Sequence, residues 1–181
     1  MPHVAPDPWT VPRAPPRSAR EAWLFAAALV VVLAGSLSLN LHQNGFPLGW
    51  HFDEPRKVRF IQEHEQNFFH PVLMLQVGRV AAVFVQPDDA QSVVEMGRTL
   101  TAVFATLNVF ACFLLFRRIA GPSVGPATAA AVAVMPGLVV HAHYLKEDLY
   151  LTPLLMLSLH AFLLHQDRRR ARTLAWWGVA T

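Results

Sequence analysis

The sequence is poor in charged residues and contains a single cysteine. Only 15% of its 181 residues are charged, whereas soluble domains carry roughly 25%. This deficit excludes an ordinary soluble domain, because 54% of the residues are hydrophobic and many of them form long uninterrupted runs. Cys112 lies inside one of these runs, so a disulfide framework and a Cys-x-x-Cys metal site are also excluded.

The net charge of +3 does not indicate a nucleic-acid-binding protein. The arginines lie beside the apolar runs, and the chain has no basic stripe with interleaved aromatic residues. We therefore expect membrane lipids, and no nucleic acid, among the partners of the chain.

Several apolar runs approach the length of a membrane span, since about 20 helical residues cross roughly 30 Å of hydrocarbon. They predict an all-α, polytopic transmembrane helical bundle. Pro136-Gly137 predicts a kink in one span. The first run is too long for the apolar region of a signal peptide and lacks an Ala-x-Ala exit, so we expect it to be retained. The expected spans are about residues 22–41, 99–116, 122–140 and 148–165, with the start of another at 173.

Both ends of the chain differ from the apolar middle. Residues 1–21 are rich in proline and arginine, which predicts a disordered cytoplasmic tail before a membrane domain over residues 22–181. The final residues read as the first turns of a further span, with Trp176-Trp177 at the membrane interface. We therefore expect a chain truncated at its C-terminus, that is, a fragment of a larger polytopic protein.

The segment 72–85 decides the topology. It is apolar but too short to cross, and Arg79 at its centre would cost roughly 2.5–3.5 kcal/mol in mid-membrane. If it does not cross, the arginines of the tail, Arg117-Arg118 and the run 168–172 all lie on one side, as the positive-inside rule favours. We expect a multi-pass protein of the cytoplasmic (inner) membrane with its N-terminus in the cytoplasm. Residues 42–97 then form an outer loop with interfacial helices.

The two outer loops carry nearly all the remaining ionisable residues. The first, residues 42–97, contains Asp53-Glu54-Pro55-Arg56, and the second, residues 141–148, ends in Lys146-Glu147-Asp148. A carboxylate beside an apolar wall can act as a general base, and nearby cations can hold a phosphate. The alternative is a solvated loop whose charges only avoid the bilayer, with Asp53 and Asp148 acting as helix caps.

The motif Asp53-Glu54-Pro55-Arg56, followed by His70-Pro71-Val72-Leu73, resembles the membrane glycosyltransferases of the GT-C type. Protein O-mannosyltransferases and the lipid A aminoarabinose transferase are the best-known examples. Members of this group have a cytoplasmic tail, one span, and an outer loop with Asp-Glu-x-Arg near its start. Gly97-Arg98-Thr99-Leu100, the mid-span Pro136 and Lys146-Glu147-Asp148 also look like this family, so the resemblance covers about residues 20–181.

The resemblance implies an inverting transfer of mannose or a related sugar from a polyprenyl-phosphate-linked donor. The acceptor would be a protein, lipid or glycan on the outer face of the membrane. Asp53 matches the base that deprotonates or orients the acceptor, and Glu54 is either its partner acid or a structural residue. The residues carried over are Asp53 and Glu54 as catalytic acids, Arg56 and His70 as donor-phosphate ligands, and Asp148 and Glu147 as a second acidic site.

Two further readings stay open at this stage. Histidines and carboxylates around residues 51–53, 63–65 and 141–143 could supply metal ligands, but none has the His-Glu-x-x-His spacing, so we expect no metal and no other cofactor. Family members have many more spans than this chain. A non-catalytic multi-span protein, either a truncated homologue, an assembly partner or a small transporter-like module, is therefore the alternative. A transporter would place ionisable groups within its spans, which here are nearly free of charge.

Overall fold

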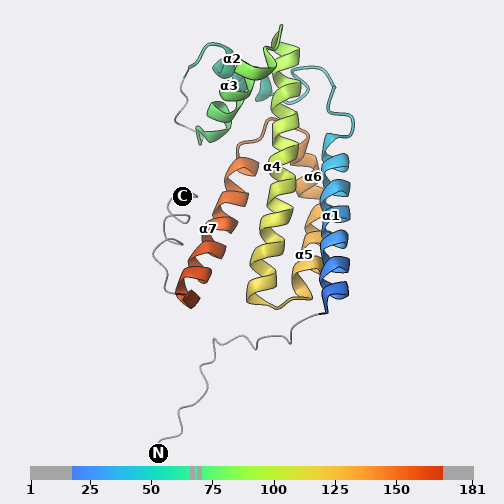
Figure 1. The fold of residues 1–181 in the computed structure, drawn as a ribbon. Helices are drawn as coiled ribbons and strands as arrows, with labels where there is room; N and C mark the ends of the chain where they lie inside the picture. Colours follow the sequence, from blue (N-terminus) through green and yellow to red (C-terminus); the bar gives the residue numbers. More distant parts are fainter. Residues whose placement is uncertain (1–17, 66–67, 69–70, 169–181) are drawn as a thin grey trace, which may run out of the picture.

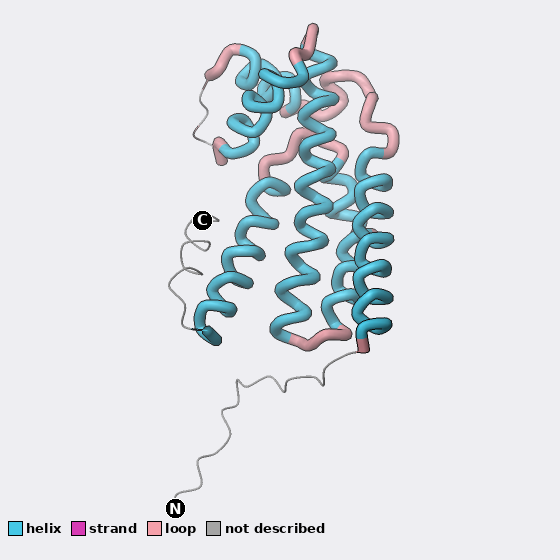
Figure 2. The backbone as a smooth tube through the Cα atoms, viewed as in Figure 1, coloured by secondary structure: helices cyan, strands magenta, loops and turns pink. Residues whose placement is uncertain are grey.

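The computed structural model describes residues 18–65, 68 and 71–168, and this part of the chain contains helices joined by loops and no strand (Figure 2). The predicted all-α fold is confirmed. The predicted tail lies outside the described residues up to position 17. The helices are α1 (Ala19–Leu41), α2 (Glu54–Gln62), α3 (Leu73–Val85), α4 (Ala90–Ile119), α5 (Val124–Ala133), α6 (Pro136–Ala142) and α7 (Asp148–Arg168) (Figure 1).

The bundle is built around α4. Helices α1, α5 and α6 pack on one side of α4, and α7 packs along another side (Figure 1). Helices α4 and α7 run in the same direction, opposite to α1 and to the α5–α6 pair. Three helices, α1, α4 and α7, are long and apolar enough to cross a membrane, and α5 with α6 makes a fourth span if the bent pair is counted as one. The chain is therefore a multi-pass membrane protein.

A capping box fixes the start of α1. The Ser18 hydroxyl accepts a hydrogen bond from the Glu21 backbone N–H, and the Glu21 carboxylate accepts one from the Ser18 N–H. These two bonds satisfy donors that have no partner within the helix, so α1 begins at Ala19, three residues before the expected start of the span.

The predicted kink at Pro136 is confirmed. Helices α5 and α6 are bent by 54° at the break between Ala133 and Pro136. Proline has no N–H to donate to the preceding turn and is tolerated in the first turn of a helix, where Pro136 lies.

Helices α2 and α3 lie together at the end of the bundle where α1 ends and α7 begins (Figure 1). We call this end the cap; it consists of the described residues of 42–89 together with residues 143–147. Arg79, in the middle of α3, donates from Nη2 to the carbonyl oxygens of Phe60, at 2.9 Å, and of Glu65. A cation at the C-terminal end of α2 is favourable, which explains why a short apolar helix retains an arginine.

Helix α4 is longer than a bilayer requires. Its 30 residues correspond to about 45 Å, whereas the hydrocarbon core is about 30 Å thick. Its first turns therefore continue into the cap and contact α2 and α3. The expected span at 99–116 lies in the C-terminal two thirds of this one continuous helix, so most of the additional turns are at its cap end.

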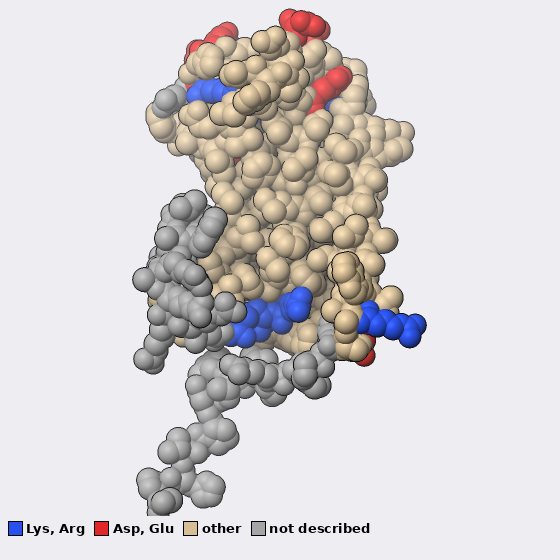
Figure 3. Space-filling view, in the orientation of Figure 1, with Lys and Arg blue, Asp and Glu red and all other residues tan. Residues whose placement is uncertain are grey.

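Charges separate between the two ends of the bundle. Lys and Arg lie where α1 begins and α4 ends, the cap carries most of the Asp and Glu together with further Lys and Arg, and a wide uncharged surface separates the two ends (Figure 3). Arg117 and Arg118 belong to the last turn of α4. The predicted arginine run 168–172 lies outside the described residues after Arg168. We call the end of the bundle where α1 begins and α4 ends, with Arg20, Arg117 and Arg118, the arginine end.

Close packing of α5 on α4 can be tested at Gly125. A Cβ atom there would lie 2.9 Å from the Phe113 carbonyl oxygen and 3.1 Å from Arg117 Cα, which are backbone atoms that cannot move aside. Gly125→Ala should therefore destabilise the bundle by about 1–3 kcal/mol. The measurement is the SDS concentration at the midpoint of unfolding in detergent micelles. Gly35→Ala is the matched control, because a Cβ at Gly35 meets nothing within 4 Å; equal midpoints for the two variants would contradict the packing.

Candidate functional site

A fully buried ion pair joins α2 to α4 in the cap. Both Glu54 and Arg98 have 0% exposure. Arg98 Nε donates to Glu54 Oε1 at 3.0 Å, and Nη2 donates to Oε2 at 2.6 Å. This two-bond arrangement is the strong form of an arginine–carboxylate pair. The structure therefore places Glu54, one of the two expected catalytic acids, away from solvent and in a structural contact.

Arg98 also fastens the segment that follows α1. Its Nη1 donates to the carbonyl oxygens of Asn44, at 3.0 Å, and of Phe46, and its guanidinium carbon lies 3.5 Å from the centre of the Phe46 ring. A guanidinium has five N–H donors, and a buried one needs most of them satisfied. Arg98 was named from the sequence only as part of the motif Gly97-Arg98-Thr99-Leu100, with no role predicted for it. A more general signal was present: an arginine at the start of an apolar run must find a partner.

The backbone of Leu145 connects the second loop to the same pair. Its N–H donates to Glu54 Oε1 at 3.1 Å, and its carbonyl oxygen accepts from Lys57 Nζ at 2.8 Å. Lys57 also forms a buried ion pair with Glu147. We call Glu54, Lys57, Arg98, Glu147 and the Leu145 backbone the polar network. Gly97 makes room for the Leu145 side chain, because a Cβ at position 97 would lie 2.1 Å from Leu145 Cδ1.

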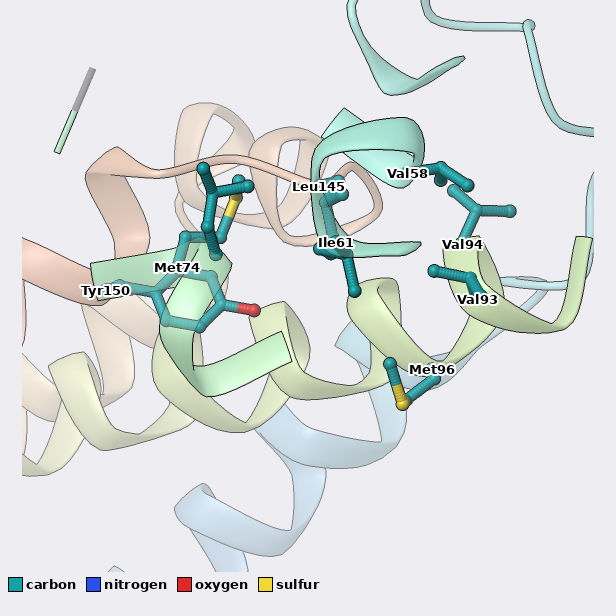
Figure 4. Close-up of a cluster of buried hydrophobic side chains, with 9 residues drawn as sticks. Val58, Ile61, Met74, Val93, Val94, Met96, Leu145 and Tyr150 are labelled. Atoms are coloured by element: carbon teal, nitrogen blue, oxygen red, sulfur yellow. The ribbon is translucent and has the colours of Figure 1, made fainter. Parts of the chain in front are cut away.

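Apolar side chains surround the polar network and exclude water from it. They come from α2, α3, the first turns of α4, Leu145 and the start of α7, and several of them interdigitate in one cluster (Figure 4). Electrostatic attraction and hydrogen bonds strengthen when water is excluded, so this cluster strengthens both ion pairs. The buried members are Val58, Ile61, Met74, Leu75, Val93, Val94, Met96, Leu145 and Tyr150.

Three of the remaining predicted site residues, Asp53, Arg56 and Asp148, lie at the rim of the network. Asp53 is half-buried directly before α2, and within the described residues its carboxylate makes no hydrogen bond or ion pair. Arg56, three residues further on, is exposed. Asp148 begins α7 with a side chain that is 70% exposed and 3.8 Å from Lys146 Nζ. His70 lies outside the described residues.

A chain of aromatic contacts leads from the buried network to Asp53. The Phe46 ring that covers Arg98 meets Tyr144 edge-on at 5.9 Å, and Tyr144 contacts His51 at 4.6 Å. His51 Nδ1 accepts a hydrogen bond from the Asp53 backbone N–H at 3.4 Å. Contacts of this kind prefer defined ring geometries. The backbone at Asp53 is therefore positioned from both sides, by His51 before it and by Glu54 after it.

Glu147 remains ionised in this setting. Its burial raises the pKa, but the hydrogen bond and the charge of Lys57, its own backbone N–H and the charge of Lys146 together hold the pKa of Glu147 below the usual glutamate value. Among the described residues, no group of three or more His, Cys, Asp and Glu side chains could hold a metal ion. The absence of a cofactor stays a prediction.

The Glu54–Arg98 pair should be essential to the stability of the cap. Arg98→Met leaves a buried carboxylate without its counter-charge and should cost about 3–5 kcal/mol of unfolding free energy. The double variant Glu54→Leu with Arg98→Met should cost less than Arg98→Met alone, because no charge stays buried. SDS-titration midpoints give the double-mutant cycle. Arg59→Met is the control for an exposed arginine, since Arg59 is 57% exposed and its ion pairs are 3.8 Å long. A loss at Arg98 no larger than at Arg59 would contradict the assignment.

The attachment of α2 should weaken in acid. Because the pKa of Glu147 is lowered in the folded protein, its pair with Lys57 contributes fully above the usual value of 4.5 and is lost as the pH falls below that value. Amide hydrogen exchange of α2 between pH 6 and 3 measures the loss. Glu147→Gln should exchange faster already at pH 6 and show a smaller change on acidification. The same acid response in variant and parent would rule out this role for Glu147.

Comparisons of the chain with protein-family models, with curated proteins and with solved structures find no match. A functional proposal for the cap therefore depends on the residues and contacts described above and on the motif resemblance of the sequence.

Proposed function

We propose that this chain acts as an inverting glycosyltransferase of the GT-C type, which transfers mannose or a related sugar from a polyprenyl-phosphate donor. The reaction would take place at the cap, on the outer face of the cytoplasmic membrane, with the N-terminus in the cytoplasm. Support for this orientation comes from Arg20 in the first turn of α1 and from Arg117 and Arg118 in the last turn of α4, since arginines that flank membrane spans favour the cytoplasmic side.

The observation that carries the proposal is the contrast between Asp53 and Glu54. Glu54 is fully buried and used by Arg98, whereas the neighbouring Asp53 is half-buried with a carboxylate that has no partner in the described chain. A general base needs an available lone pair and a fixed position. The buried pair supplies the position, and Asp53 supplies the base.

The proposed reaction is a single displacement at the anomeric carbon. The acceptor hydroxyl oxygen forms a bond to that carbon while Asp53 takes the hydroxyl proton. The bond between the anomeric carbon and the phosphate oxygen breaks, and its electron pair leaves with the polyprenyl phosphate. Attack opposite the leaving group inverts the anomeric configuration. The exposed Arg56 can stabilise the charge that develops on the departing phosphate, and His70 is the second residue proposed for this role.

The surface near this end suits a donor with a lipid tail. Helix α3, which contacts α7, presents exposed apolar side chains, among them Val80, Val83 and Phe84. An isoprenoid chain in the bilayer could lie against such a surface while its sugar-phosphate head reaches the cap. Membrane lipids would cover the same residues when no donor is bound.

The test is sugar transfer in membranes from cells that express the full chain. The probe is radiolabelled polyprenyl-phosphate mannose, with the glucose and aminoarabinose forms assayed in parallel, and the readout is label in lipid, protein and glycan fractions. Asp53→Asn should reduce transfer at least a hundredfold, because it removes the general base. Asp88→Asn is the matched control, an exposed aspartate in the loop before α4 that should leave transfer unchanged.

Two results would overturn the proposal. Parental membranes that transfer none of the three sugars above the background of non-expressing cells would favour the alternative, a non-catalytic multi-span protein. Activity in Asp53→Asn equal to that in Asp88→Asn would remove Asp53 from catalysis. Correct membrane insertion of each variant is checked by its expression and by its SDS-titration midpoint.

A further inference from the structure

The imidazole of His51 presents an unused hydrogen-bond donor. Its Nδ1 accepts a hydrogen bond from the Asp53 backbone N–H, so this nitrogen carries a lone pair and no proton. The single N–H of the neutral ring is therefore on Nε2. Within the described residues Nε2 has no hydrogen-bond partner and is not a buried atom. The ring thus offers one N–H group to a ligand.

Two aromatic rings fix the direction of this donor. The Phe52 ring stacks on the imidazole, with ring centres 5.1 Å apart and an angle of 20° between the planes. Tyr144, from the loop before α7, contacts the same imidazole at 4.6 Å. Aromatic pairs of this kind prefer defined geometries. Together with the bond at Nδ1 they hold the ring in place, so the donor at Nε2 is positioned before a ligand arrives.

The Phe52 ring is an aromatic surface that the fold leaves open. It is 83% exposed although it stacks on His51. The face of an aromatic ring carries partial negative charge and attracts the weakly positive C–H groups of a ligand. Because the stacking on His51 already restricts the ring, a ligand that packs on Phe52 loses little further side-chain freedom.

Asp53 completes the set with an acceptor. Its carboxylate is half-buried and has no partner within the described residues. Three consecutive residues therefore supply a fixed N–H donor, an open aromatic surface and a carboxylate acceptor. A pyranose ring matches this set, because it has an apolar face of C–H groups and a rim of hydroxyls that both donate and accept. A few convergent polar groups beside an apolar surface are typical of small-ligand sites.

We infer that His51, Phe52 and Asp53 form a saccharide-binding site. The Phe52 ring packs on the C–H face of a pyranose, His51 Nε2–H donates to one sugar oxygen, and the Asp53 carboxylate accepts from a sugar hydroxyl. The inference rests on the proposed function for the reaction that the bound sugar undergoes, whereas binding itself requires no transfer. The pyranose is that of the lipid-linked donor or that of a glycan acceptor.

Insertion of Phe52 into the bilayer is the less favourable use of the exposed ring. It would bring the His51 N–H and the Asp53 carboxylate toward hydrocarbon, where a polar group without a partner and a charge are both costly. Arg56, which is also exposed, lies only three residues further on. A polar ligand with an apolar face satisfies all of these groups, and a lipid tail does not.

The experiment measures binding to the full chain in lipid nanodiscs by saturation-transfer NMR titration. The probes are mannobiose and a short-chain polyprenyl-phosphate mannose, with the sugar-free polyprenyl phosphate as the lipid reference. Phe52→Ala should weaken the binding of a sugar probe about three- to tenfold, as expected for one aromatic stacking contact. Phe52→Tyr keeps the ring and should bind like the parent. Phe68→Ala is the matched control, since Phe68 is 78% exposed and also belongs to the cap.

The probes distinguish the two sources of the sugar. Weaker binding of mannobiose by Phe52→Ala assigns the site to a glycan acceptor. Weaker binding of the mannose-bearing lipid, with the sugar-free lipid unchanged, assigns it to the donor. Equal weakening of both lipids would show that Phe52 contacts lipid and would overturn the inference. Unchanged binding in Phe52→Ala, or no binding of either sugar probe by the parent, would overturn it as well.

Failure of the site and failure of the proposed function give different results. A parent chain that binds a sugar probe but transfers no sugar contradicts the proposed function and leaves the site in place. A chain that transfers mannose with the same KM values in Phe52→Ala as in the parent contradicts the site alone.

The donor role of His51 has its own measurement. In the parent chain labelled with ¹⁵N-histidine, the His51 signal should show the proton on Nε2, and this signal should shift when the bound sugar probe is added. His51→Phe keeps an aromatic ring but has no N–H, and should bind the sugar about three- to tenfold more weakly. A proton on Nδ1, or a His51 signal that does not respond to a sugar that binds, would remove His51 from the site.

Discussion

The ion pair between Glu54 and Arg98 is the contact on which the cap depends. It joins four separate parts of the chain: the segment after α1, the start of α2, the upper turns of α4, and the loop before α7. The buried pair fixes their relative positions, because a charge without its partner in this apolar setting would be far less stable.

Two pairs of neighbouring acids, one at the start of α2 and one at the start of α7, each combine a structural position with a more accessible one. Asp53 is accessible and Glu54 is buried; Glu147 is buried and Asp148 is accessible. Each buried acid pairs with a cation of another element, Glu54 with Arg98 and Glu147 with Lys57. The adjacent acid, Asp53 or Asp148, then projects in a different direction from the backbone. Two adjacent carboxylates can thus serve different purposes, one as an anchor and the other as a group available for chemistry. The contrast is an outcome of backbone geometry and requires no difference in residue type.

Local patterns in the sequence were sufficient for the bundle. The lengths of the apolar runs predicted the spans, Pro136 predicted the break, and Arg79 with a short apolar run predicted that 72–85 does not cross. The contacts of the candidate site were beyond such patterns. Glu54 meets residues 44 and 91 positions away, and nothing in the local composition selects Arg98 and Leu145 as its partners. Tertiary packing decides which of the two neighbouring acids is buried. Sequence patterns alone could not separate Asp53 from Glu54, and both were therefore expected to be catalytic.

Helix α4 runs without interruption from the arginine end into the cap, and this continuity has a mechanical consequence. A span that is longer than the local hydrocarbon thickness adjusts by tilting. Because Arg98 lies on the same rigid rod, a tilt of α4 displaces the anchor of α2 and the backbone at Asp53 along with it. The position of α2 and of the Asp53 backbone is therefore tied to the tilt of a membrane span and does not depend on the loops alone.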